Sequence, residues 1–192
     1  KNTPTIGGVG LIENIDILEN FSSLNIDDSI YMLGKKGEHL SCSAFEEVFY
    51  NTASNNPPEI DLNQEQRNGD AILSLIQEKI ISSCHDISDG GMIVAICEMI
   101  MRDSLGATID MIDDDTMMGQ LFGEDQSRYI ITISPQYENI FKGKMKKLGI
   151  KYELIGRITS SQLKINESII ISSGELRDSY EGLIPSIMNN KA

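Results

Sequence analysis

Apolar residues recur along this chain with two different periods, which predict where its helices and strands lie. Over residues 61–79 they fall mainly three or four positions apart, which predicts an amphipathic helix with Asp61 as its N-cap. The same spacing over residues 92–100 predicts a second, more deeply buried helix. Short apolar runs bounded by glycine or polar residues predict strands at residues 29–34 and 129–133.

The other segments alternate between strand-like and helix-like patterns. The further elements that we expect are strands at residues 5–12, 107–111, 152–158 and 165–171 and helices at residues 43–50, 136–148 and 173–185. An Asn- and Pro-rich stretch at residues 51–58 cannot extend a helix and predicts a surface loop. We therefore expect an α/β (α+β) fold, a mixed sheet with helices on its faces, as a single domain over residues 1–192.

Composition and charge exclude several classes of protein. The chain is 40% apolar and 23% charged, which is typical of a soluble globular protein. Its net charge of -13 repels phosphate backbones, so nucleic acid is not an expected partner. No apolar stretch approaches the roughly 18 to 20 residues of a membrane span. Three cysteines without metal-type spacing fit a reducing cytoplasm, and the start without methionine predicts a piece of a longer polypeptide.

A polar, glycine-containing run precedes the helix predicted at residues 92–100. A helix N-terminus presents free backbone N–H groups and partial positive charge, so this run could order an anion or a metal-bound water. The residues concerned are Ser88, Asp89, Gly90 and Gly91. Asp86, just after an apolar segment, could coordinate Mg²⁺. The alternative is structural, with Asp89 capping the helix, the glycines allowing close packing and His85 in a hydrogen-bonded structural role.

A second charged segment runs straight into the next predicted strand. Within it, Glu124 and Asp125 could be metal-linked ligands, and Gln126 could hydrogen-bond a substrate. Arg128 could pair with a phosphate, or else form an internal ion pair with Glu124 or Asp86. No Ser-His-Asp or Cys-His nucleophile pattern can be assigned, so we name no catalytic residue.

Taken together, the motifs of this chain resemble those of a known family. The segments that carry the resemblance are residues 3–12, 85–91, 121–129, 156–158 and 175–177. In this order they resemble the last C-type domain of the phosphoribosylformylglycinamidine synthases, in the AIR synthase superfamily. The resemblance implies the fold of an AIR synthase C-terminal domain.

The resemblance also implies a function. These ligases of purine biosynthesis convert formylglycinamide ribonucleotide to the amidine with ATP, Mg²⁺ and glutamine-derived ammonia. A C-terminal domain would be inactive alone, and its partners would be the remaining domains of its own chain, a glutaminase subunit or domain, and an accessory subunit. By pseudo-symmetry, Glu124, Gln126 and Arg128 would bind the small-molecule substrate, residues 88–91 the nucleotide, and Asp86 the metal ion.

One segment departs from the family pattern. Where paired glycines are expected, this chain has Ser41 and Cys42, which tolerate positive φ poorly and add bulk where a phosphate would approach. The alternatives are therefore a C-type domain of another ATP-using enzyme of the superfamily, of selenophosphate synthetase or thiamine-phosphate kinase type, or a non-catalytic interaction module. An excised domain could also self-associate through a face that is normally covered.

Overall fold

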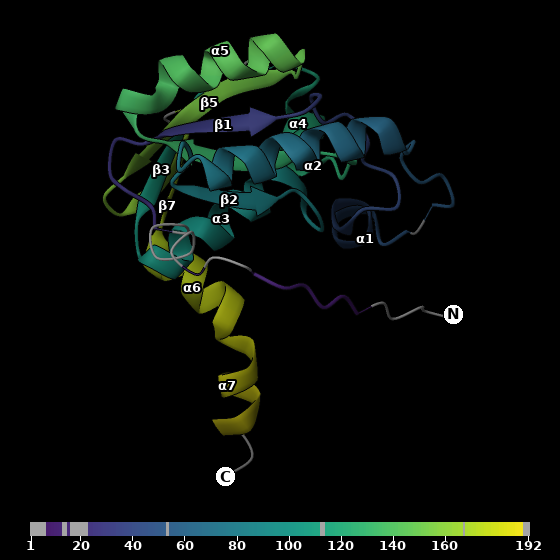
Figure 1. The fold of residues 1–192 in the computed structure, drawn as a ribbon. Coiled ribbons are helices and arrows are strands. Elements are labelled where there is room, and N and C mark those ends of the chain that lie inside the picture. The colour runs from purple at the N-terminus through teal and green to yellow at the C-terminus, as the bar shows by residue number, and fades with distance from the viewer. Residues whose placement is uncertain are drawn as a thin grey trace.

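The computed structural model describes residues 7–12, 15, 23–52, 54–111, 114–166 and 168–189. A seven-stranded sheet in the order β2-β4-β1-β5-β3-β6-β7 carries helices on both faces (Figure 1). The strands are β1 (Ser29–Leu33), β2 (Ser83–Asp86), β3 (Gly106–Ile109), β4 (Tyr129–Ile133), β5 (Tyr152–Thr159), β6 (Gln162–Ile165) and β7 (Ile169–Ser172). The helices are α1 (Ala44–Tyr50), α2 (Leu62–Gln77), α3 (Gly91–Asp103), α4 (Met117–Phe122), α5 (Glu138–Leu148), α6 (Ser173–Glu181) and α7 (Leu183–Asn189).

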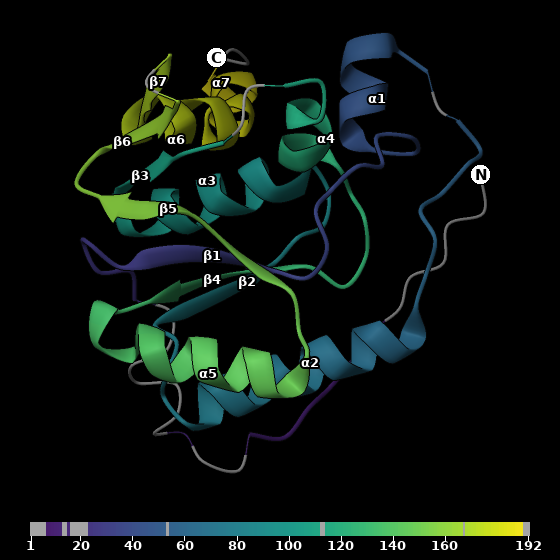
Figure 2. The ribbon, with the colours of Figure 1, turned by 90° about the horizontal axis from the view of Figure 1, so that it is seen from above.

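Strand β1 lies in the interior of the sheet, between β4 and β5, and its alternating side chains divide the core into two layers. Ile30 and Met32 join the apolar cluster of α3, whereas Tyr31 and Leu33 join that of α2 and α5. Figure 2 shows α2 and α5 on one face of the sheet and α3, α4 and α6 on the other. All five residues of β1 are buried because both faces are covered. The mixed sheet with helices on its faces is confirmed.

The two longest helices lie where the apolar spacing predicted them. The side chain of Asp61 accepts a hydrogen bond from the backbone N–H of Gln64 at 3.0 Å, which confirms the N-cap of α2. Helix α3 buries Met92, Ile96 and Ile100 on one face. Among the described residues, no helix is long and apolar enough to cross a membrane.

Three expectations about element boundaries are wrong. The strand predicted over residues 165–171 is divided between the end of β6 and most of β7, which pair antiparallel, because Asn166 adopts φ 48 and the chain turns back. Residues 7–12 form no strand, and the rest of that predicted strand lies outside the described residues. The last predicted helix is divided at Gly182 into α6 and α7, and α7 continues through Pro185, which tolerates a position in the first turn.

Helix α5 is tied to the central strand by one carboxylate. Glu138 accepts hydrogen bonds from Lys142 Nζ at 2.7 Å, Ser29 Oγ at 2.6 Å and Tyr31 Oη at 3.1 Å. These bonds lower the pKa of Glu138 to about 2, and the bond from Lys142 makes the largest contribution. Because this pKa lies below that of an unfolded glutamate, about 4.3, the bonds stabilise the fold above that pH and lose their effect as the pH falls toward 2.

We expect Glu138→Gln to lower the free energy of unfolding at pH 7 by roughly 1 to 2 kcal/mol, because hydrogen bonds to a charged group are lost or weakened. Urea denaturation at pH 7, 5 and 3 would measure the difference from the unmodified chain, which should shrink as the pH falls. Asn139→Ala, at an exposed neighbour on the same helix, is the control. A difference that stays constant across this pH range would contradict the role of the Glu138 charge.

Candidate functional site

The two polar motifs of the sequence lie side by side because β2 and β4 pair at one edge of the sheet. In this antiparallel pair, Asp86 at the end of β2 lies opposite Tyr129 at the start of β4. Just beyond the strands, the backbone N–H of Ile87 donates to the carbonyl of Arg128 at 3.0 Å. The residues that follow β2 therefore adjoin the residues that precede β4.

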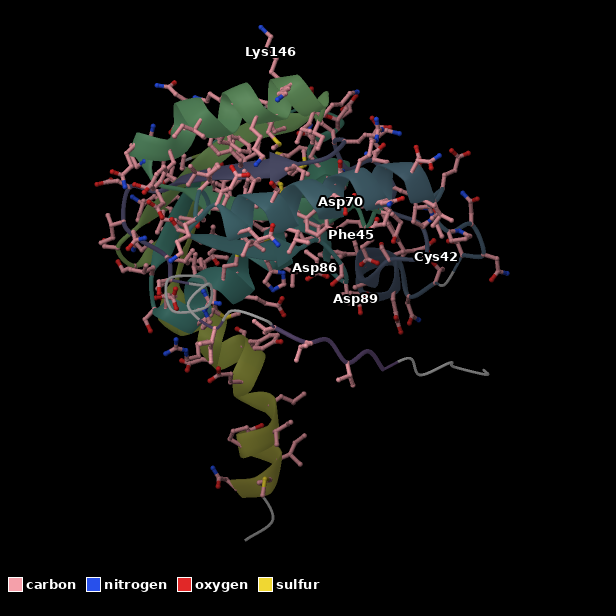
Figure 3. All side chains as sticks on the ribbon, in the orientation of Figure 1. Cys42, Phe45, Asp70, Asp86, Asp89 and Lys146 are labelled. Carbon is pink, nitrogen blue, oxygen red and sulfur yellow. The ribbon has the colours of Figure 1, made fainter. Side chains whose placement is uncertain are left out.

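Both motifs line one cavity of about 320 Å³. The predicted site residues that it brings together are Asp86, Ser88, Asp89, Glu124, Gln126 and Arg128. Gly90 and Gly91 are buried and do not line it. Figure 3 shows Asp86 and Asp89 between the sheet and α1, and Cys42 on the other side of α1. The cavity thus collects the polar groups of three separate loops.

Glu124 binds the backbone at the start of two helices. One oxygen, Oε1, accepts from the N–H of Gly90, the residue before α3, and from the N–H of Ala44, the first residue of α1, at 2.8 Å each. Both N–H groups belong to helix N-termini, where a negative charge is favourable. Glu124 therefore fixes the walls of the cavity, in addition to lining it.

The start of α3 depends on glycine rather than on a side-chain cap. Gly90 and Gly91 adopt φ values of 84 and 73, in the left-handed region that favours glycine. A Cβ on Gly91 would lie 2.6 Å from the carbonyl carbon of Phe122, so α4 packs directly against this backbone. No side chain of the run itself caps α3, and the expectation that Asp89 does so is wrong.

Asp86 presents an exposed carboxylate beside His85. The side chain of Asp86 is 68% exposed, and Oδ1 lies 3.6 Å from His85 Nδ1. His85 Nε2 lies 3.2 Å from Glu98 Oε2 on α3. The histidine thus lies between two carboxylates, which agrees with its structural alternative. Within the described part of the chain, no group of three His, Cys, Asp or Glu side chains is arranged to hold a metal ion.

Arg128 is buried behind the second motif, with a side chain only 1% exposed. Its Nη1 donates to the carbonyl of Gly123 at 2.9 Å and lies 3.9 Å from Asp125 Oδ2. The ion-pair partner is therefore Asp125, and the expected pairing with Glu124 or Asp86 is wrong. Burial lowers the pKa of Arg128, and the charge of Asp125 opposes that shift.

Asp125 connects this motif to the loop after β1. Its Oδ2 accepts from the backbone N–H of Glu38 at 2.8 Å and of His39 at 3.0 Å. The loop carrying Ser41 and Cys42 is therefore anchored by a carboxylate that also faces Arg128. Two adjacent acidic residues fix the backbone of two different loops, which local sequence could not reveal.

Cys42 has a left-handed backbone conformation. Its φ is 58, a conformation that is strained for a residue with a side chain. Glu46 Oε2 accepts from the N–H of Ser54 at 3.1 Å and from the N–H of Cys42 at 2.7 Å, and these bonds lower the pKa of Glu46. These hydrogen bonds hold the loop in this conformation, which Cys42 adopts without being glycine.

The sequence reasoning missed the contribution of α2. Asn68 is buried, and its Nδ2 donates to the carbonyl of Ser127 at 2.8 Å. Ser127 Oγ donates to Glu65, which lines the cavity. The signal that could have found them is the three-residue spacing of Glu65 and Asn68, which places both polar groups on one side of the helix.

Comparison with known proteins adds the following findings. The family model of AIR synthase related protein, C-terminal domain, matches residues 25–166. The PurL subunit of phosphoribosylformylglycinamidine synthase from Brucella ovis is 33% identical over 98% of this chain and 25% of its own length. The chain therefore spans about a quarter of the curated relatives that it matches.

Two solved structures share the fold. PurL of Thermotoga maritima complexed with FGAR matches 84% of this chain and 29% of its own, with a TM-score of 0.70 and 16% identity. PurLQS from Thermotoga maritima matches 80% of this chain and 26% of that chain, with a TM-score of 0.60 and 16% identity.

Removal of the Glu124 carboxylate should loosen both helix starts. We expect Glu124→Ala to lower the free energy of unfolding by about 1 to 3 kcal/mol, because two N–H groups lose a charged acceptor. Hydrogen exchange at the amides of Gly90 and Ala44 should accelerate. Gln126→Ala is the control, because the exposed Gln126 side chain makes one long bond of 3.4 Å to the Glu124 carbonyl. Unchanged protection at both amides would contradict the capping role.

The three thiols should differ in reactivity. Burial raises the pKa of Cys84 to about 12 and that of Cys97 to about 11, whereas Cys42 is exposed. We expect iodoacetamide at pH 8 to modify Cys42 in the folded chain and the other two thiols only after denaturation, as measured by peptide mass spectrometry. Equal modification of all three thiols under native conditions would contradict this burial.

Proposed function

This chain belongs to the family of AIR synthase related proteins, as their C-terminal domain, and on this premise we propose that it is the last domain of a phosphoribosylformylglycinamidine synthase. That ligase would convert formylglycinamide ribonucleotide to the amidine, with ATP as energy source and ammonia derived from glutamine. The observation that carries the proposal is the 33% identity to a PurL subunit over 98% of this chain. Because the chain spans a quarter of that relative, it would have no turnover alone.

In this proposal the 320 Å³ cavity is the surface that the domain contributes to ligand binding. Gln126, Ser88 and Asp89 have exposed side chains at its wall and could reach a substrate or a nucleotide. Glu124 and Arg128 would act as positioning residues, because their contacts fix the surrounding backbone. Gly90 and Gly91 would contribute by opening α3 toward the cavity. No residue of the chain is assigned a catalytic role.

The chain alone does not fit a complete metal site. Asp86 offers a single exposed carboxylate, and no cluster of three acidic, His or Cys side chains lies among the described residues. Mg²⁺ in nucleotide enzymes is commonly held by one or two carboxylates together with substrate phosphates and water. Asp86 is therefore proposed as a ligand only beside a bound phosphate compound, and no chemical step is routed through it.

The proposed partners follow from the length and the relatives of the chain. The remaining domains of a longer polypeptide would cover part of its surface, as expected for a domain that spans a quarter of its relatives. A glutaminase and an accessory subunit would deliver ammonia, and the PurLQS assembly of Thermotoga maritima supports this arrangement. The net charge of -13 argues against nucleic acid, and the ligase would work in the cytoplasm.

An activity assay tests the proposal. The complete polypeptide that carries this chain should form ADP and the amidine from formylglycinamide ribonucleotide, ATP and ammonium ions, whereas the 192-residue chain should form none. Ammonium replaces the glutaminase, so the result does not depend on finding that partner. Thiamine monophosphate with ATP, supplied in parallel, tests the kinase alternative. Phosphorylation of thiamine monophosphate without amidine formation would reject the ligase.

A further inference from the structure

One edge of the Arg128 guanidinium has no partner. Nη1 donates to the Gly123 carbonyl, but among the described residues neither Nε nor Nη2 has a hydrogen-bond acceptor, although both are buried. These two N–H groups leave the planar guanidinium on the same side, as a fork that matches the two oxygens of a carboxylate. An unsatisfied charged group in the interior is costly, so this edge requires an acceptor from elsewhere.

A cavity of about 60 Å³ adjoins this arginine. It is larger than the roughly 10 to 15 Å³ that a single water requires. Gly37 lies on its wall, and a Cβ there would be 2.8 Å from Arg128 Nη2, which locates the guanidinium at the same wall. The apolar part of the lining is formed by Met32, Met92, Met111 and Ile155. Such walls limit water and strengthen a charged hydrogen bond.

We propose that this cavity binds a small carboxylate, whose two oxygens accept from Nε and Nη2 of Arg128. The free fork supplies the geometry, and the volume admits an acid of one or two carbons or the carboxylate end of a longer molecule. Arg128 also lines the 320 Å³ cavity, but the other lining residues of the two cavities differ. The inference does not rest on the proposed ligase activity.

An ion pair forms part of the wall of the cavity. Lys36 Nζ and Glu153 Oε1 are 3.0 Å apart, with side chains 45% and 38% exposed, and both residues line the cavity. Both also line a groove of about 1170 Å³, so the small cavity adjoins this groove. Two carboxylates of the chain line this cavity, Glu153, which is held by Lys36, and Asp110. Neither accepts a hydrogen bond from Nε or Nη2 of Arg128, so the fork is left for an external carboxylate.

Occupation of the cavity would affect the neighbouring loops. Nη1 of the same guanidinium holds the Gly123 carbonyl and faces Asp125, which in turn anchors the loop after β1. A carboxylate on the opposite edge would fix the plane of the guanidinium. Binding in the small cavity would thereby stiffen the backbone that borders the 320 Å³ cavity.

Thermal unfolding of the 192-residue chain with a series of sodium salts at constant ionic strength tests the site. Formate and acetate should raise Tm in a saturable way, by roughly 2 to 4 °C at a few times the dissociation constant, relative to chloride. Pivalate, whose carboxylate carries a tert-butyl group, is the matched control and should behave like chloride because it is too bulky. Equal effects of all four salts would overturn the proposal.

A variant at Arg128 tests whether the rise in Tm with formate arises at the proposed site. Arg128→Lys keeps a positive charge but lacks the two-pronged fork, so the formate response should decrease at least tenfold in apparent affinity. A formate response that is unchanged in this variant would also overturn the proposal. If the variant does not fold, the salt series on the unmodified chain decides, together with a crystal structure from formate. Density for two oxygens on Nε and Nη2 would support the site, and water alone there would reject it.

Discussion

The hydrogen bonds of the Glu124 carboxylate are the interaction on which the candidate site depends. One oxygen satisfies the backbone at the starts of α1 and α3, two helices that are far apart in the sequence. Without it, two buried or partly buried N–H groups would compete for water, and the loops would separate. The neighbouring Asp125 does the same for the loop after β1. The adjacent carboxylates of Glu124 and Asp125 thus hold together the loops that border the candidate site.

Local periodicity predicted the elements of the fold well, and the reason is physical. The three- and four-residue spacing of apolar side chains in α2 and α3 reflects burial on one face, and the N-cap at Asp61 needs only the next helical turn. The division into β6 and β7 had a signal in the sequence, because the three polar residues 166–168 interrupt the apolar run. The prediction of one strand joined the apolar residues on either side and overlooked this turn.

The sequence drew attention to the two polar motifs but indicated neither that they meet nor how their residues are used. The pairing of β2 with β4 brings both motifs together. The acceptor for Gly90 and the contribution of Asn68 depend on tertiary contacts between residues distant in sequence. The partner of Arg128 is local, because Asp125 lies only three residues before it. From residue type alone, Glu124 and Asp125 were interpreted as metal-linked ligands. In the fold, both carboxylates accept hydrogen bonds from backbone N–H groups of the chain itself. Family membership identified the architecture more directly than it identified the chemistry.

The central position of β1 has a consequence for synthesis on the ribosome. This strand pairs with β4 and β5, so its second partner emerges only after about 120 further residues. At about 5 to 20 residues per second, the most buried strand of the sheet would wait roughly 6 to 24 seconds for that neighbour. During this interval its apolar side chains would be open to chaperones and to other nascent chains. The delay arises because β5 lies next to β1 in the sheet but far from it along the chain.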